Sequence, residues 1–212
     1  WYIDRVVGRL AETVNFVIRT VRQRIQSDMY AQQLQVISPD YEDLSKKWHN
    51  YNGNSPLVAF FNAVYPLSSE IIWCINQYTF PIVFKKGKFL VSPFNDNDNL
   101  YFIVKGVVRG YIKEDDKEIT TWINEENEIV GSIRNLRLKL ATEEYLQALE
   151  DCTLIGVPKP FIDYLYDTFP EANLIGRILL EDNYRGAEER AYICRIPSAE
   201  KRYRRFLETQ PG

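Results

Sequence analysis

The chain has 212 residues, 45% of them hydrophobic, and a formal net charge of −3. That length suits one medium domain or two small ones, and the negative charge does not favour a surface made for nucleic acid. Its three cysteines (Cys74, Cys152 and Cys194) are scattered without a CxxC spacing, as is typical of a reducing compartment. With a single histidine besides, we expect no metal site.

Two further classes of protein are not expected. No apolar run reaches the roughly 18–20 residues of a membrane span, and no signal-peptide pattern opens the sequence. We therefore expect a cytoplasmic protein that makes no membrane contact. The sequence also lacks a P-loop, a Gly-x-Ser-x-Gly motif and a Cys-His arrangement, so we expect no enzyme and no catalytic residue.

Residues 2–34 carry the strongest helical pattern. Apolar residues recur there at alternating spacings of four and three: Ile3, Val7, Leu10, Val14, Val17 and Val21. This heptad-like stripe predicts an amphipathic helix that buries one face, either on its own domain or against a second subunit. The polar stretch from Ser38 to Asn54 reads as a connector, so residues 1–54 form the first predicted domain.

The pattern after this connector changes from helices to strands. Two helices are expected over residues 55–77, the second beginning near Ser68. Short apolar runs separated by turn residues follow, which is typical of an antiparallel barrel or roll. The expected strands lie at 79–84, 88–91, 100–112 (two strands about Gly106) and 118–123, and the expected later helices at 160–168, 171–194 and 199–208. This order predicts an α+β fold: an antiparallel β-roll flanked by helices, with an additional N-terminal helical segment.

The runs 84–90 and 100–109, with glycine turns at Gly87 and Gly106, resemble the cyclic-AMP receptor protein (Crp/Fnr-type) family of bacterial transcription regulators. Residues 55–68 resemble the entry helix of its Bacteroidetes-type members. The resemblance implies a jelly-roll-like β-roll (a double-stranded β-helix) with its entry helices over residues 55–170, which senses a ligand. It implies a dimerisation helix and linker over 171–212. It also implies a C-terminal helix-turn-helix that binds DNA, and we expect that module to be absent from this chain.

Residues 126–152 resemble the phosphate-binding cassette of that family with its charge reversed. In the family, a glutamate takes the ribose hydroxyl and an arginine takes the cyclic phosphate. Here Glu128 falls on the ribose position, Asn127 replaces the preceding glycine, and Thr142 falls on the arginine position. The residues of this degenerate pocket are Asn127, Glu128, Ile129, Thr142, Glu143 and Tyr145. We expect a positive φ at Asn127 and a structural role for Glu128 as an acceptor for backbone donors.

A buried phosphate needs a counter-charge, which an arginine fork supplies. A carboxylate ~4 Å from an anion instead costs about 4 kcal/mol at an effective dielectric near 20, roughly a thousandfold in affinity. We therefore expect no cofactor, cyclic AMP included, and a sensing and dimerisation portion of a transcription regulator. Two alternatives stay open: a working cyclic-nucleotide sensor in which Arg134 or Arg137 is the substitute cation, and a structural oligomerisation protein. The expected partner is a second copy, bound through the helix at 171–194. The N-terminal helix is a second candidate for this contact.

Overall fold

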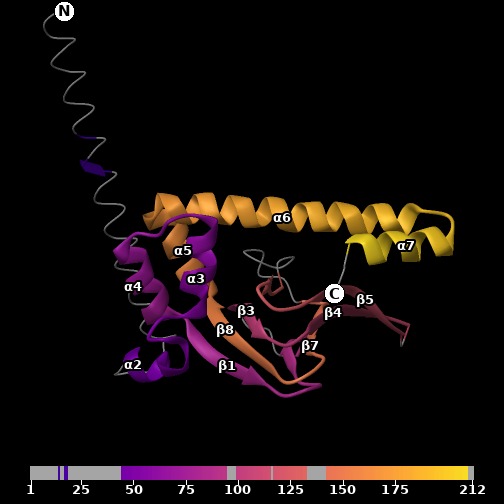
Figure 1. Ribbon diagram of the computed structural model, residues 1–212, viewed down its shortest axis with the longest axis horizontal. Helices are drawn as coiled ribbons and strands as arrows, with labels where there is room; N and C mark the ends of the chain where they lie inside the picture. Colours follow the sequence, from indigo (N-terminus) through magenta and orange to yellow (C-terminus); the bar gives the residue numbers. More distant parts are fainter. Residues whose placement is uncertain are drawn as a thin grey trace, which may run out of the picture. The chain divides into compact units, whose positions relative to one another are not determined.

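The computed structural model describes residues 44–94, 99–115, 117–132 and 142–209, together with residues 14, 17 and 18. The chain divides into two compact units, Trp1–Phe169 and Pro170–Gly212. The first unit contains the strands and the second contains two helices (Figure 1).

Little of the predicted N-terminal helix falls within the described residues. Val14, Val17 and Ile18 are helical, and all three side chains are exposed. The other positions of the predicted stripe, and the connector before Leu44, lie outside the described residues.

Within the described residues from Leu44 on, the helical elements before the roll are α2 (Leu44–Lys47), the 3₁₀ turn η1 (His49–Tyr51), α3 (Pro56–Val64) and α4 (Ser69–Tyr78). The two predicted helices at 55–77 correspond to α3 and α4. Pro56 begins α3, where its missing N–H costs no hydrogen bond. The ring of Phe60 in α3 lies 4.8 Å from that of Phe102, centroid to centroid, so α3 packs on the roll.

The last part of the polar connector is tied to the C-terminal end of α4. Trp48 is fully buried, and its Nε1 donates to the carbonyl of Asn76 at 2.9 Å. Lys47 Nζ donates to the carbonyls of Asn76 at 3.0 Å and Gln77 at 2.9 Å, and the backbone N–H of Ser55 donates to Asn76 Oδ1. Burial lowers the pKa of Lys47 to about 8. These bonds satisfy carbonyls that the end of a helix leaves without partners.

In the described part of the chain eight strands follow, arranged in two antiparallel four-stranded sheets with the orders β1-β8-β3-β6 and β2-β7-β4-β5. Their bounds are β1 (Phe80–Phe84), β2 (Phe89–Val91), β3 (Asn99–Lys105), β4 (Val108–Glu114), β5 (Lys117–Asn124), β6 (Ile129–Val130), β7 (Tyr145–Ala148) and β8 (Cys152–Pro158). Helix α5 (Lys159–Thr168) continues directly from β8. The predicted α+β class and antiparallel roll are confirmed.

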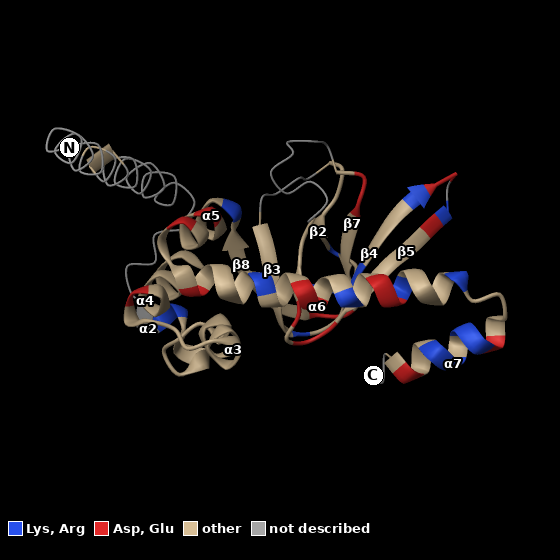
Figure 2. Ribbon diagram, turned by 90° about the horizontal axis from the view of Figure 1, so that it is seen from above, with Lys and Arg blue, Asp and Glu red and all other residues tan. Residues whose placement is uncertain are grey.

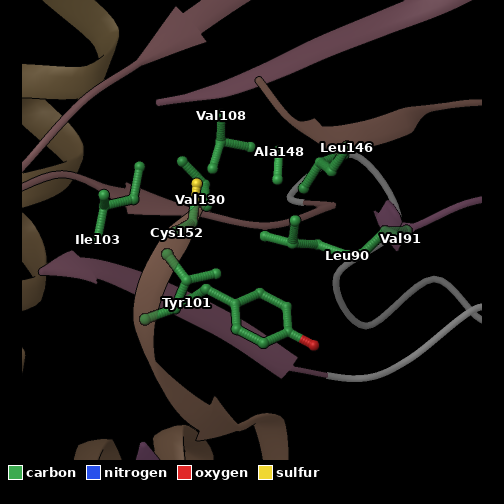
Figure 3. Close-up of a cluster of buried hydrophobic side chains, with 10 residues drawn as sticks. Leu90, Val91, Tyr101, Ile103, Val108, Val130, Leu146, Ala148 and Cys152 are labelled. Carbon is green, nitrogen blue, oxygen red and sulfur yellow. The ribbon is translucent and has the colours of Figure 1, made fainter. Parts of the chain in front are cut away.

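The main hydrophobic core lies between the two sheets (Figure 3). Both sheets contribute buried side chains to it: Leu90, Val91, Val108, Leu146 and Ala148 from one, and Tyr101, Ile103, Val130, Cys152 and Leu154 from the other. Because side chains alternate along a strand, the neighbours of these residues in β3, β4, β7 and β8 point away from the core. In β2 the adjacent Leu90 and Val91 both belong to the core, next to a register shift. The core therefore defines an inner and an outer face for each sheet.

The second unit is a helical hairpin of α6 (Pro170–Arg195) and α7 (Ala199–Thr209), close to the predicted helices. The guanidinium of Arg205 donates through Nε and Nη2 to the carboxylate of Glu189, at 2.6 and 3.1 Å. Arg202 Nη1 donates to the carbonyl of Ile196 at 2.8 Å. Figure 2 shows the basic segments of α7. Arg202 and Arg205 thus have partners within the hairpin.

The predicted turns at Gly87 and Gly106 both have positive φ, 80° and 107°. A Cβ at Gly87 would meet no atom within 4 Å, whereas one at Gly106 would lie 2.7 Å from Cys152 Sγ and 3.0 Å from Cys152 Cα. Gly106 is thus required both by its backbone conformation and by close packing on β8.

We expect Gly106→Ala to destabilise the roll more than Gly87→Ala. Both substitutions introduce strain at positive φ, about 1 kcal/mol. Only Gly106→Ala also adds a methyl group to a filled space, which costs about 1–3 kcal/mol more. Urea unfolding of the two variants measures the difference. Equal losses of unfolding free energy would contradict the packing argument.

Candidate ligand site in the roll

The turn between β5 and β6 holds the first half of the predicted cassette. Asn127 has a φ of 68°, as expected, and its N–H donates to the carbonyl of Ile103 at 2.9 Å. The carboxylate of Glu128 accepts the backbone N–H of Glu125 at 2.8 Å, and its carbonyl accepts the N–H of Ile103. The exposed Glu128 side chain thus serves as an acceptor for a backbone donor. Ile129 is half-buried beside Phe102 of β3 in the sheet register.

Glu126 also supports this turn, and the sequence analysis missed it. Its Oε1 accepts the backbone N–H of Gly106 at 2.9 Å. The two residues are 20 positions apart, so no local spacing in the sequence links them. The side chains of Glu126 and Glu128 both bind backbone donors, and this anchors the turn.

The second half of the predicted cassette contains a small network of hydroxyl and backbone hydrogen bonds. Thr142 is only 3% exposed, and its Oγ1 lies 3.2 Å from Ser132 Oγ and accepts the N–H of Glu144 at 3.1 Å. Ser132 Oγ also donates to the carboxylate of Glu144 at 3.4 Å. Glu143 is exposed. Arg134 and Arg137 lie outside the described residues.

Tyr145 lies on the outer face of its sheet. The next residue, Leu146, belongs to the core, so the alternation of β7 directs Tyr145 away from it. Its ring stacks on Tyr111 with centroids 4.9 Å apart and an interplanar angle of 11°. Lys113 Nζ lies 5.0 Å from the centroid of the Tyr145 ring. In this position Tyr145 does not fill the space between the sheets.

The same outer face carries a cross-strand network around Arg109 that the sequence analysis missed. Arg109 Nη2 donates to Glu118 at 2.6 Å and to Gln147 Oε1 at 3.0 Å, and its guanidinium lies 4.3 Å from the Tyr111 ring centroid. The hydrogen bond from Arg109 lowers the pKa of Glu118, and burial raises the pKa of Tyr111. Because the partners come from three strands, only the sheet register brings them together. These contacts hold the guanidinium of Arg109 on the outer face of the sheet.

On the inner face, Gly110 of β4 faces Trp122 of β5 and Leu146 of β7 in the register. The indole of Trp122 packs against the core cluster. This pair was not predicted from the sequence, although a glycine within a strand often marks a close approach.

Within the described ranges, no group of three or more His, Cys, Asp and Glu side chains is placed to hold a metal ion. Nor is any helix of the described part of the chain both long and apolar enough to span a membrane.

Comparisons with known proteins agree with this geometry. Residues 81–169 match the family model of the cyclic nucleotide-binding domain. A protein assigned to the Crp/Fnr family of transcriptional regulators from Eubacterium rectale is similar in structure with a TM-score of 0.59 and 18% identity, over 72% of this chain and 71% of that one. A cyclic nucleotide-binding domain from Methylobacillus flagellatus has a TM-score of 0.55 and 15% identity, covering 67% and 84%.

A CooA variant from Carboxydothermus hydrogenoformans has a TM-score of 0.50 and 22% identity, covering 67% of this chain and 90% of its own. No curated protein sequence matches. The β-roll thus has the fold of cyclic nucleotide-binding domains, and most of it matches their family model. The predicted resemblance to the Crp/Fnr type is confirmed in the fold. Together these findings support a sensing or regulatory role.

We expect Thr142→Val to destabilise the roll by about 1–2 kcal/mol. Valine has a similar shape but leaves the Ser132 hydroxyl and the Glu144 N–H without the Thr142 oxygen. Denaturant unfolding measures the loss, and Glu143→Gln on the exposed neighbour is the matched control with an effect within about 0.5 kcal/mol. A neutral Thr142→Val would show that the hydroxyl has no structural role.

Proposed function

We propose that this chain is the sensing and dimerisation portion of a Crp/Fnr-like transcription regulator whose cassette no longer binds a cyclic nucleotide. The observation that carries the proposal is Thr142, a buried neutral hydroxyl in place of the cassette arginine. We place such a regulator in the cytoplasm. Its DNA contact would be made by a module outside this chain, and we assign it no catalytic step.

The chemistry around Thr142 disfavours an anion. Its hydroxyl is already engaged with Ser132 and with the backbone of Glu144, so a phosphate would have to displace those bonds. A carboxylate follows two residues later and lies 3.4 Å from Ser132 Oγ. A buried phosphate without a charged donor loses the stronger, charge-assisted type of hydrogen bond. The Arg109 guanidinium does not replace that donor, because it is bound to Glu118 and Gln147.

Helix α6 supports the dimerisation part of the proposal. Side chains at spacings of four and three form an exposed stripe along it: Leu180, Tyr184, Ala187, Ala191 and Cys194. Leu180 is 59% exposed and Tyr184 is 64% exposed. An a/d stripe of this kind is typical of a helix that packs against another helix. We propose a second copy of α6 as that partner.

Calorimetry with cyclic AMP and cyclic GMP tests the sensing part. We expect no binding by the full chain up to about 0.1 mM nucleotide, since the missing cation alone accounts for roughly a thousandfold or more in affinity.

Tight binding of either nucleotide would overturn the degenerate cassette. In that case, loss of binding in Arg134→Ala or Arg137→Ala would identify a substitute cation, with Lys139→Ala as the matched control.

Sedimentation tests the dimer. We expect Tyr184→Lys to weaken self-association at least tenfold, because it places a charge in an apolar helix contact. Asn183→Lys, on the neighbouring exposed position of the same helix, is the matched control and leaves association unchanged. A dimer that survives Tyr184→Lys but is lost on deletion of residues 1–34 would assign assembly to the N-terminal segment instead.

A further inference from the structure

The inner face of the sheet β2-β7-β4-β5 is covered at one point by an aromatic side chain of the chain itself. A Cβ built on Gly110 would lie 2.5 Å from Trp122 Nε1 and closer still to its Cε2 and Cζ2. The indole therefore rests directly on the backbone of β4. Gly110 is itself buried, and Trp122 is partly buried against the core cluster.

A bulge in β5 gives Trp122 this inward direction. Tyr111 pairs with Thr120, but the adjacent Gly110 pairs with Trp122, so Thr121 is an extra residue in the strand. Thr121 Oγ1 donates to the carbonyl of Gly110 at 3.1 Å. Because one inserted residue reverses the alternation, Thr120 stays on the outer face and Trp122 turns to the inner face.

We propose that Trp122 is a built-in occupant of the roll. Its indole takes the space above Gly110 that a planar aromatic ligand, such as a purine base, would need between the sheets. This inference rests on the proposed function in treating the roll interior as the ligand site, and it adds a second obstacle, steric and independent of the charge at Thr142.

Two features favour an occupant over an ordinary core residue. A glycine within a strand forfeits the packing and rigidity of a side chain, so Gly110 is best explained by the close approach of the ring. Trp122 also lies on β5, the edge strand of its sheet, and is only partly buried. Its removal would leave an apolar space above Gly110, and apolar cavities bind small aromatic molecules.

Indole itself is the probe. We expect the full chain with Trp122→Ala to bind indole with a Kd of about 1 mM. At ten times that concentration, indole raises the unfolding midpoint of this variant by about 3 °C. The wild-type chain, and the matched control Trp73→Ala on the exposed side of α4, show no such shift. A folded Trp122→Ala variant that responds to indole no more than the wild type overturns the proposal.

A second measurement applies even where Trp122→Ala does not fold. Gly110→Ala lowers the unfolding midpoint by about 5 °C in the wild-type chain, because its Cβ displaces the indole. In a Trp122→Leu background, the same substitution costs less than half as much. Equal shifts in the two backgrounds overturn the close packing on which the proposal depends.

The results with indole do not depend on whether the proposed function is correct. Indole carries no phosphate, so its binding does not depend on the cassette. Cyclic AMP binding by the wild-type chain would reject the degenerate cassette, whereas the indole comparison tests Trp122 alone.

Discussion

Side chains alternate between the inner and outer faces along β4, β5 and β7, and this alternation decides which of them can reach the interior of the roll. Val108, Leu146 and Ala148 point into the shared core, so their neighbours point out. Arg109 and Tyr145 are therefore engaged on the outer face, away from the interior. A single bulged residue in β5 changes that alternation and turns an indole inward.

In the cassette, the contacts that hold the turn in place are made within the protein itself. Its turn is held by backbone hydrogen bonds, by the positive φ of Asn127 and by the carboxylates of Glu126 and Glu128. None of these contacts needs a nucleotide, so the turn persists without one. Thr142, at the predicted arginine position, is within hydrogen-bond distance of Ser132 Oγ and accepts the backbone N–H of Glu144.

Local patterns accounted for most of the elements but for few of the contacts. The helices α3 to α6 and the strands about Gly106 follow from periodicity, proline and glycine positions, which act within a few residues. The burial of Trp48 did not follow, because its partner Asn76 lies 28 positions away in a helix and the surrounding stretch is polar. The network of Arg109 likewise joins side chains from three strands.

The amino-acid order alone was enough to predict an antiparallel roll and its glycine turns, since each depends on residue identity or short-range spacing. The direction of Trp122 needed the folded molecule. An unbroken period of two would place Trp122 and Thr120 on the same face, and no local signal marks Thr121 as the inserted residue. The pairing of β5 with β4 determines where the inserted residue lies. In this register the indole of Trp122 packs against the backbone of Gly110, which has no side chain.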